Sequence, residues 1–397
     1  MIDHLFASEG GLERQPPIDP TIASASTSYR QSASRIDSFA VALERLLLPS
    51  KAYTSQDVFE AEMRDVFPSS WVLVAELDEI ATPGAFVATM IGQEPVLIVR
   101  DNTGSLNAFA NVCPHRGTTI AAGMGNCGTG FECPYHGWTF STDGALVSIP
   151  NRKGFSNQVR QDQLSLRSLR LETWERFIFV NIDESAPALN SYLEAIPALL
   201  AQHAISDLSA TVHIDDIVDV NWKLLVDNAL DDYHLPVVHT HSLQPTLEGM
   251  KLREYIGNRY ASILCMPLNE SGQLQYPPRA ELGEEQALSA YAIDVFPNLT
   301  IIAMPDGGIS TLRFDPISVS QTAVQFRSYS HSPGEPELDE ERFASEVLNE
   351  DYNVMYRVQQ GIRSRYFKPG PAHYLEGRVA TFHATLLDLL DEELELS

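Results

Sequence analysis

The sequence predicts an α+β protein made of two units, a small all-β module followed by a larger module of mixed helices and strands. Its 397 residues exceed what one ordinary core accommodates, so two domains are expected. Apolar runs typical of strands crowd together between about residues 71 and 181. In the second half, helical patterns and strands occur without strict alternation, which favours the α+β class over α/β.

The first unit is expected at residues 46–185, behind an N-terminal arm at 1–45. The arm is rich in Ser, Thr, Ala and Pro and shows little apolar periodicity. A helix is predicted at 57–66. Apolar runs separated by Pro-Gly and Asp-containing turn signals then predict strands. These strands are expected at 71–75, 85–89, 95–100, 106–110 and 176–181.

The second unit is expected at residues 186–397. Its predicted helices lie near 189–203, 221–234 and 339–365, and one of its strands near 299–303. No internal repeat or low-complexity linker separates them.

The charge balance excludes some classes of function. The chain has 27 Lys and Arg against 53 Asp and Glu, a net charge of −26, whereas nucleic-acid binders need a basic footprint. No apolar stretch approaches the roughly 18 residues needed to span a bilayer, and no secretory signal is visible at the N-terminus. Four cysteines are too few for a disulfide framework. A cytoplasmic protein that binds neither nucleic acid nor membrane is therefore expected.

The first metal motif is a pair of Cys/His legs. Seventeen residues separate Cys113-Pro-His115 from Cys133-Pro-Tyr-His136, and a glycine follows each histidine closely. A [2Fe–2S] cluster with two Cys on one iron and two His on the other requires this set. Glycines permit backbone N–H groups to approach the cluster sulfurs.

A structural zinc site is the alternative, since two Cys and two His also suit tetrahedral Zn²⁺. Zinc fingers, however, usually pair Cys with Cys and His with His, not one of each on both legs. The motif therefore favours the iron–sulfur cluster. The remaining cysteines, Cys127 and Cys265, fit neither leg and are predicted to be ordinary thiols.

The second metal motif lies in the predicted helix at 221–234. Asp227, Asp231 and His234 stand at helical spacings of four and three, which would place them on one face. Pro236 denies that helix its continuation, so the chain must turn and can bring His239 beside His234. His241 is the competing ligand.

Two His and one carboxylate are the ligands that non-haem Fe(II) uses to activate O₂. The carboxylate must come from elsewhere in the chain, and the C-terminal helix offers Glu350 and Asp351. Adjacent helical residues point about 100° apart, so only one of the two is expected to bind.

Both motifs resemble those of the Rieske non-haem iron oxygenases, in particular the oxygenase (α) component of the ring-hydroxylating type. The likeness extends over about residues 50–390. It implies a Rieske [2Fe–2S] domain and a helix-grip (START-like) catalytic domain with an antiparallel sheet, carrying one cluster and one mononuclear Fe(II) per subunit. It selects Asp351, two turns before Gln359, as the third iron ligand. It also assigns Asp231, with Asp232 as competitor, to bridge to a cluster histidine of a neighbouring subunit.

The resemblance implies the terminal oxygenase of a multicomponent system, inserting oxygen from O₂ into a small organic substrate. A ferredoxin or flavin reductase would supply electrons to a homotrimer, with or without a small β subunit. An aromatic compound is the first expectation, and a quaternary ammonium compound of the choline, betaine or carnitine type is the alternative. An aromatic cage would suit a cation, and Arg259 or Arg313 an aromatic carboxylate. The cage candidates are Tyr255, Tyr260, Tyr291 and Phe296.

Overall fold

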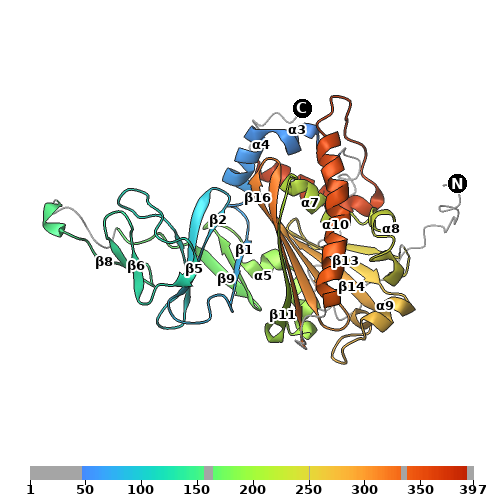
Figure 1. Cartoon of the computed structure of the whole chain (residues 1–397), viewed down its shortest axis with the longest axis horizontal. Coiled ribbons are helices and arrows are strands. Elements are labelled where there is room, and N and C mark those ends of the chain that lie inside the picture. Colours follow the sequence, from blue (N-terminus) through green and yellow to red (C-terminus); the bar gives the residue numbers. More distant parts are fainter. Residues whose placement is uncertain (1–46, 156–163, 250, 332–337, 391–397) are drawn as a thin grey trace.

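The computed structural model shows two units side by side, a slender β module and a broader sheet-and-helix module (Figure 1). It describes residues 47–155, 164–249, 251–331 and 338–390. The predicted N-terminal arm at 1–45 lies outside these ranges. The α+β class is confirmed, because strands make up the first unit and an antiparallel sheet with helices makes up the second. Among the described residues, no helix is long and apolar enough to cross a membrane.

Three short helical elements precede the β module: α3 (Ser50–Thr54), α4 (Gln56–Ala61) and the π-helical turn η1 (Glu62–Val66). Ser55 caps α4, because its side chain accepts a hydrogen bond from the Val58 N–H. These elements cover 57–66, where the sequence predicts a helix, and their apolar side chains join the core of the second unit.

The β module consists of three small sheets. One has the order β1-β10-β9, the second β4-β3-β2-β5 and the third β6-β7-β8. Strand β3 is central in its sheet, and Val96 to Val99 are fully buried, which explains their continuous apolar run. The strands are β1 (Val72–Glu76), β2 (Ala85–Ile91), β3 (Glu94–Arg100), β4 (Leu106–Ala110), β5 (Gly123–Asn126), β6 (Gly130–Glu132), β7 (Thr139–Ser141), β8 (Leu146–Ser148), β9 (Arg170–Trp174) and β10 (Phe177–Asn181).

The second unit is built on one seven-stranded antiparallel sheet of order β11-β17-β16-β15-β14-β13-β12. The long helix α10 crosses it (Figure 1). The strands are β11 (Ser209–Val218), β12 (Arg253–Ile256), β13 (Ala261–Pro267), β14 (Ser289–Val295), β15 (Leu299–Ala303), β16 (Ile309–Ser318) and β17 (Gln321–Ser330). The helices are α5 (Leu189–Leu193), α6 (Ile196–Leu200), α7 (Trp222–Leu230), α8 (Leu235–Val238), α9 (Glu270–Gln275), α10 (Leu338–Gly361) and α11 (Gly377–Leu389).

The two faces of this sheet pack against different partners. Helices α7, α10 and α11 share a core with inward side chains such as Phe314 and Val324. Helices α5 and α6 pack on the other face with Ile263 and Ile293. Successive strand residues point to opposite faces, so each residue's parity decides which core it joins.

Two predicted helices are wrong in extent. The apolar segment 189–203 is divided into α5 and α6, because Glu194 adopts a left-handed φ of 54° between them. The segment 221–234 is helical only to Leu230. Asn221 does cap α7, as the sequence suggests, by accepting from the Lys223 N–H at 3.0 Å.

Candidate metal centres

The two Cys/His legs fold into closely similar loops at the end of the β module. The Cys113 N–H donates to the Thr118 carbonyl at 2.8 Å, and the Gly117 N–H donates to the Cys113 carbonyl at 2.9 Å. Cys133 repeats this pattern with Trp138 and Gly137, at 2.8 and 3.0 Å. Gly117 and Gly137 have φ values of 77° and 69°, a region where a side chain is strained. The fourth position after each cysteine therefore favours glycine.

The side chains of these loops face one another. Cys113 and Cys133 are buried and form no disulfide, and the rings of His115 and His136 lie 4.5 Å apart between centroids. Burial raises the pKa of the Cys113 thiol, while backbone N–H groups of His115 and Arg116 that point at its sulfur act in the opposite sense. The buried Nδ1 of His115 has no hydrogen-bond partner among the described residues. Two thiols and an unpartnered imidazole nitrogen fit the ligands of a [2Fe–2S] cluster.

The spacing of these ligands favours two irons over one zinc. A single tetrahedral Zn²⁺ at about 2.0–2.3 Å from each ligand would bring all four ligand atoms within about 4 Å of one another. Among the described residues, the only set of three such groups with ligand atoms within 4.8 Å of one another lies in the other unit. The Cys/His legs are spread more widely, as ligands shared between two irons are.

Cys265, which the sequence predicts to be an ordinary thiol, lies on β13 of the other unit, and its sulfur is 3.2 Å from Arg253 Nη2.

The second centre brings together three groups from two separate segments: His234, His239 and Asp351. The two Nε2 atoms lie 3.2 Å apart. Asp351 Oδ1 lies 3.1 Å from Nε2 of His239 and 3.6 Å from Nε2 of His234. Asp351 is on α10, and the histidines flank α8, which is only four residues long. His239 is 1% exposed, whereas the competing His241 is exposed.

The local backbone differs from the predicted helical face. Asp231 ends α7 with an extended ψ of 111°, and its Oδ1 accepts from the Tyr233 N–H at 2.7 Å. A short acidic side chain that bonds the backbone in this way competes with helix continuation. Asp231 and His234 therefore do not share a helical face with Asp227. Pro236 occupies the first turn of α8, so it starts a new helix there.

The outward nitrogens of both histidines have partners that fix the rings. His234 Nδ1 lies 2.5 Å from the Asp231 carbonyl, and His239 Nδ1 lies 2.8 Å from Glu350 Oε2. Both Nδ1 atoms therefore donate, which leaves lone pairs on the two Nε2 atoms that face Asp351. Burial opposes protonation of His239, but the carboxylates of Asp351 and Glu350 outweigh it and raise the pKa of the ring.

These contacts fit a divalent metal ion. Asp351 Oδ1 is buried and accepts no hydrogen bond from a described residue. A buried carboxylate oxygen that faces two imidazole nitrogens is an arrangement that a divalent cation between them would satisfy. Glu350 instead accepts from Ser242 Oγ at 2.5 Å and contacts the far side of His239. The two adjacent acids thus point to different nitrogens of His239, and Asp351 is the one on the metal side.

Asp231 and Asp232 have different surroundings. The Asp231 side chain is 23% exposed, and its Oδ2 lies 3.6 Å from His234 Nδ1. Asp232 is buried and pairs with Arg378 Nη1 at 3.0 Å. Because Asp232 is committed to a buried guanidinium, Asp231 remains the acid available for a bridge to another subunit. That role stays a prediction.

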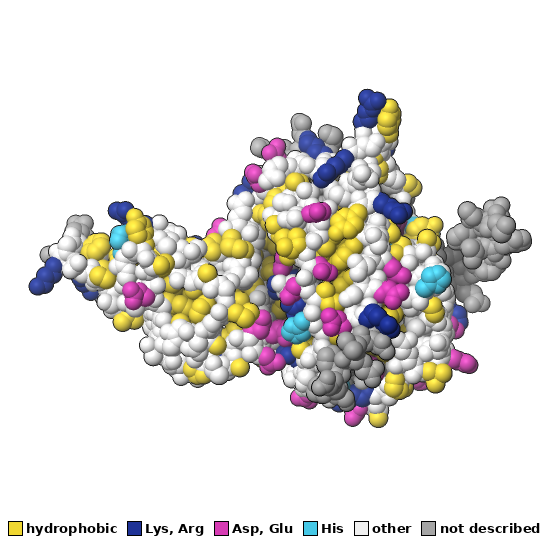
Figure 2. Space-filling model, viewed as in Figure 1, with side chains coloured by type: hydrophobic (Ala, Val, Ile, Leu, Met, Phe, Trp, Pro, Cys, Tyr) yellow, Lys and Arg dark blue, Asp and Glu magenta, His cyan; other side chains and the backbone are white. Residues whose placement is uncertain are grey.

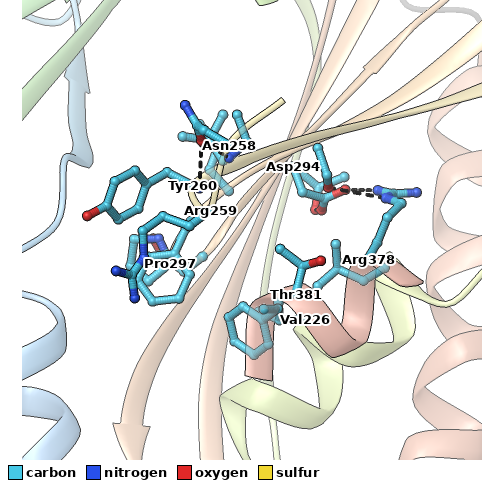
Figure 3. A pocket seen from close by; sticks show the side chains of 17 residues that line it. Val226, Asn258, Arg259, Tyr260, Asp294, Pro297, Arg378 and Thr381 are labelled. Carbon is cyan, nitrogen blue, oxygen red and sulfur yellow. Dashed lines mark hydrogen bonds and ion pairs between the residues drawn. The ribbon is translucent and has the colours of Figure 1, made fainter. Parts of the chain in front are cut away.

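A buried charge cluster near this centre has no counterpart in the sequence prediction. Arg378 pairs with Asp232 and Asp294, and Glu254 completes the group. Burial is the main cause that raises the pKa of Glu254 to about 7, and the Asp232 carboxylate adds to it. Figure 3 shows Arg378 and Asp294 on the wall of a pocket that also includes Tyr260 and Arg259. No metal ligand is among the described residues that line it.

The surroundings of the metal ligands are apolar on the sheet side. Leu235, beside His234, packs with Leu264 and Ala292. Tyr255 and Tyr291 belong to the core on the opposite face, and Tyr260 stacks on Tyr192 at 4.2 Å. We call the cluster around Leu235 the apolar patch. Its buried members are Leu235, Leu252, Leu264 and Ala292, and its partly buried members are Leu243, Leu247, Met266 and Ile302.

The other proposed substrate contacts are also engaged away from the metal ligands. Phe296 packs in the core with Phe382 at 5.5 Å. Arg259 pairs with Asp388, and Arg313 with Asp315. Neither the suggested aromatic cage nor the suggested carboxylate-binding arginines therefore face the metal ligands.

Comparison with known proteins matches both units. Residues 70–170 match the family model of the Rieske [2Fe-2S] domain, and residues 206–392 match the ring hydroxylating alpha subunit (catalytic domain). The chain belongs to the Rieske non-haem iron oxygenase family. Its two domains are therefore those that hold a [2Fe–2S] cluster and a mononuclear iron. The expected boundary at 185/186 falls between the two matches and stays a prediction.

Individual relatives include oxygenases of two kinds. The chain is 35% identical over 198 residues to the carnitine monooxygenase oxygenase subunit of Escherichia coli K12, covering 49% of this chain and 53% of the relative. This chain thus matches about half the length of that relative. It is 28% identical over 302 residues to the biphenyl 2,3-dioxygenase subunit alpha of Rhodococcus jostii RHA1, covering 67% and 65%.

The fold is shared with a solved quaternary ammonium Rieske monooxygenase, crystallised with an inhibitor. That structure superposes with a TM-score of 0.76 at 24% identity, over 89% of this chain and 98% of the other. The predicted pairing of a Rieske domain with a catalytic domain is confirmed.

Proposed function

We propose that this chain is the terminal oxygenase of a multicomponent Rieske system and inserts oxygen from O₂ into a small organic molecule. The observation that carries the proposal is the convergence of His234, His239 and Asp351 in a chain that also holds the two Cys/His legs. When bound, the cluster supplies electrons one at a time, and the mononuclear iron supplies the site of O₂ activation.

The residues of the chain have separate tasks in this proposal. Cys113, Cys133, His115 and His136 hold the cluster. His234, His239 and Asp351 hold the iron from one side, which leaves other positions for O₂. The apolar patch around Leu264 and Ala292 excludes water from the sheet side and gives the substrate an apolar surface.

Asp231 is proposed to connect two subunits. Its carboxylate is partly exposed beside His234 and can accept an N–H from a cluster histidine of a second copy. His136 of the Rieske domain is exposed, so its ring is accessible to such an acid. This arrangement requires a ring of subunits, and we propose a homotrimer. A ferredoxin or flavin reductase is the proposed electron donor.

Asp231→Asn tests this connection. The variant should retain both metals, and dithionite should still reduce its cluster, but the reduced cluster should not reoxidise when substrate and O₂ are added. The loss should exceed about 100-fold in rate, because electron transfer now lacks its bridging acid. Asp57→Asn, an exposed acid on α4, is the matched control. Normal reoxidation in Asp231→Asn would refute the bridge.

For the substrate, we propose a quaternary ammonium compound ahead of an aromatic one. The carnitine relative has the higher identity of the two relatives. The apolar patch suits N-methyl groups. It suits an aromatic ring equally, and for this reason an aromatic substrate is the second candidate.

A single turnover of the reduced protein under ¹⁸O₂ separates the two substrate classes. One pool would contain choline, betaine and carnitine, and the other aromatic acids and hydrocarbons. A singly labelled or demethylated product from the first pool supports the proposal. A ring product with two labelled oxygens would establish the aromatic alternative. Protein without mononuclear iron would overturn the oxygenase assignment.

A further inference from the structure

The last turn of α10 and the segment after it carry an island of positive charge in a strongly acidic protein. Between Asp351 and Glu376 the chain has four cations and no acid, although 53 acids in 397 residues would put about three in an average stretch of this length. The cations are Arg357, Arg363, Arg365 and Lys368, and all four are exposed. We call these four side chains, with Tyr366 and Phe367, the basic loop.

The basic loop projects from the catalytic domain. Figure 2 shows Lys and Arg side chains gathered at the top of the view, where Figure 1 places the chain leaving α10. Tyr366 is 78% exposed and Phe367 39% exposed, so apolar rings lie among the charges. No described acid forms an ion pair with Arg363 or Lys368. Exposed aromatic and Arg side chains are typical of protein interfaces.

Backbone contacts hold this segment in place. The Leu47 N–H donates to the Gly370 carbonyl at 3.1 Å, and Ser50 Oγ donates to the Ile362 carbonyl at 2.5 Å. Within the segment, the Phe367 N–H bonds the Ser364 carbonyl at 3.0 Å. The side chains therefore project from an ordered backbone, which lowers the entropy lost when a partner binds.

The segment ends beside the proposed entry point for electrons. The ring of His373 stacks on Tyr233 at 4.1 Å between centroids, and Tyr233 lies between Asp231 and His234 in the sequence. Tyr233 is itself 45% exposed. Through His373 and Tyr233, the segment that carries the basic loop therefore reaches the place where the proposed bridge of Asp231 would bring the Rieske domain of a second copy.

We propose that the basic loop is the docking surface for an acidic electron-donor protein. This inference rests on the proposed function. A net charge of −26 repels an acidic donor over most of the surface, so a local cluster of cations is needed to steer it. In the reaction, one electron leaves the reduced [2Fe–2S] cluster of the donor and is accepted by the oxidised Rieske cluster. Plant-type ferredoxins have the lower reduction potential, so the transfer is downhill.

The test is the rate at which a reduced, acidic plant-type [2Fe–2S] ferredoxin reduces the oxidised Rieske cluster under anaerobic conditions. Stopped-flow absorbance follows the bleaching of the Rieske cluster against ferredoxin concentration and NaCl. For the wild-type protein, the second-order rate constant should fall as salt rises. The triple variant Arg363→Glu, Arg365→Glu, Lys368→Glu should be at least about tenfold slower at low salt, and the difference should shrink at high salt.

A matched variant distinguishes the basic loop from a docking site on the Rieske domain. Lys153 is exposed in the Rieske domain, outside the two Cys/His legs. Lys153→Glu should stay within about twofold of wild type. A tenfold loss in Lys153→Glu with an unchanged triple variant would move the docking site to the Rieske domain and overturn the proposal.

The oligomeric state and a single turnover complete the test. Light scattering should give the same mass for the triple variant and the wild type, and a changed mass would mean that the loop contacts a second copy instead. Single turnover of chemically reduced triple variant should match wild type, because no donor is needed. Wild-type protein without mononuclear iron would refute the proposed oxygenase function, whereas the cluster-reduction rate tests the docking surface alone.

Discussion

Replacing Glu350 and Asp351 one at a time tests which carboxylate binds the iron and which holds the histidine. Glu350 Oε2 lies 2.8 Å from His239 Nδ1, on the side of the ring away from Asp351. Asp351 Oδ1 lies 3.1 Å from Nε2 of the same ring and is buried without a donor. The two variants should therefore have unequal effects on iron binding.

The expected magnitudes follow from these contacts. Glu350→Gln keeps an oxygen that can accept from His239 Nδ1, but it removes the negative charge that strengthens the ligand. Loss of such a supporting acid typically lowers metal affinity by about 10–100-fold, which corresponds to about 1.4–2.7 kcal/mol. Asp351→Asn removes a ligand itself and should leave too little affinity to retain iron through dialysis.

The assay is Fe(II) titration of protein from which the mononuclear iron has been removed, with cluster absorbance as an internal measure of intact protein. Glu346→Gln, an exposed acid one turn earlier on α10, is the control and should bind iron like wild type. The reasoning is refuted if Glu350→Gln is iron-free while Asp351→Asn keeps wild-type affinity, because Glu350 would then be the ligand.

Three further predictions concern other buried groups. Cys113→Ala should abolish the visible absorbance and electron paramagnetic resonance signal of the cluster, whereas Cys127→Ser should retain both; equal loss would contradict the ligand assignment. Lys223 and Glu62 form a fully buried ion pair at 2.6 Å. Lys223→Met leaves the Glu62 charge unpaired and should lower the free energy of unfolding by about 3–5 kcal/mol, whereas Lys223→Met with Glu62→Gln removes both charges and should lower it less. Denaturant unfolding of both variants measures this difference. In the folded chain the pKa of Glu254 is raised from 4.5 to about 7, so the folded state binds a proton there more tightly than the unfolded state does. The free energy of unfolding therefore falls as the pH rises from about 4.5 to about 7. Glu254→Gln should thus raise the unfolding temperature more at pH 8 than at pH 5, and an equal gain at both would refute the shift.

Motifs of short sequence range were predictable because their chemistry is local. Each Cys/His leg spans only a few residues, and its glycine is required by a positive φ four residues after the cysteine. Apolar runs also indicated the strands from local sequence, because alternating apolar residues are typical of a strand with one buried face and continuous ones of a strand buried on both faces. The sequence therefore determined the α+β class, the β module and the residue types of both candidate centres.

Tertiary packing decided the features that depend on distant segments. Glu350 and Asp351 are adjacent in sequence, and only the position of α10 against α8 shows which faces the lone pairs of the histidines. Tyr255 and Tyr291 were plausible cage residues until strand parity placed them on the far face of the sheet. The end of α7 at Leu230 depends on a side-chain bond of Asp231 that competes with the helix.

The buried charges illustrate the same limit. Arg378 is separated by more than 140 positions from Asp232, and Lys223 by about 160 from Glu62, so no local pattern links them. Local sequence specifies which groups can bind a metal or start a helix, because these depend on neighbouring residues. Which carboxylate meets which cation, and which face of a strand meets the substrate, depends on chain segments brought together only when the whole domain packs.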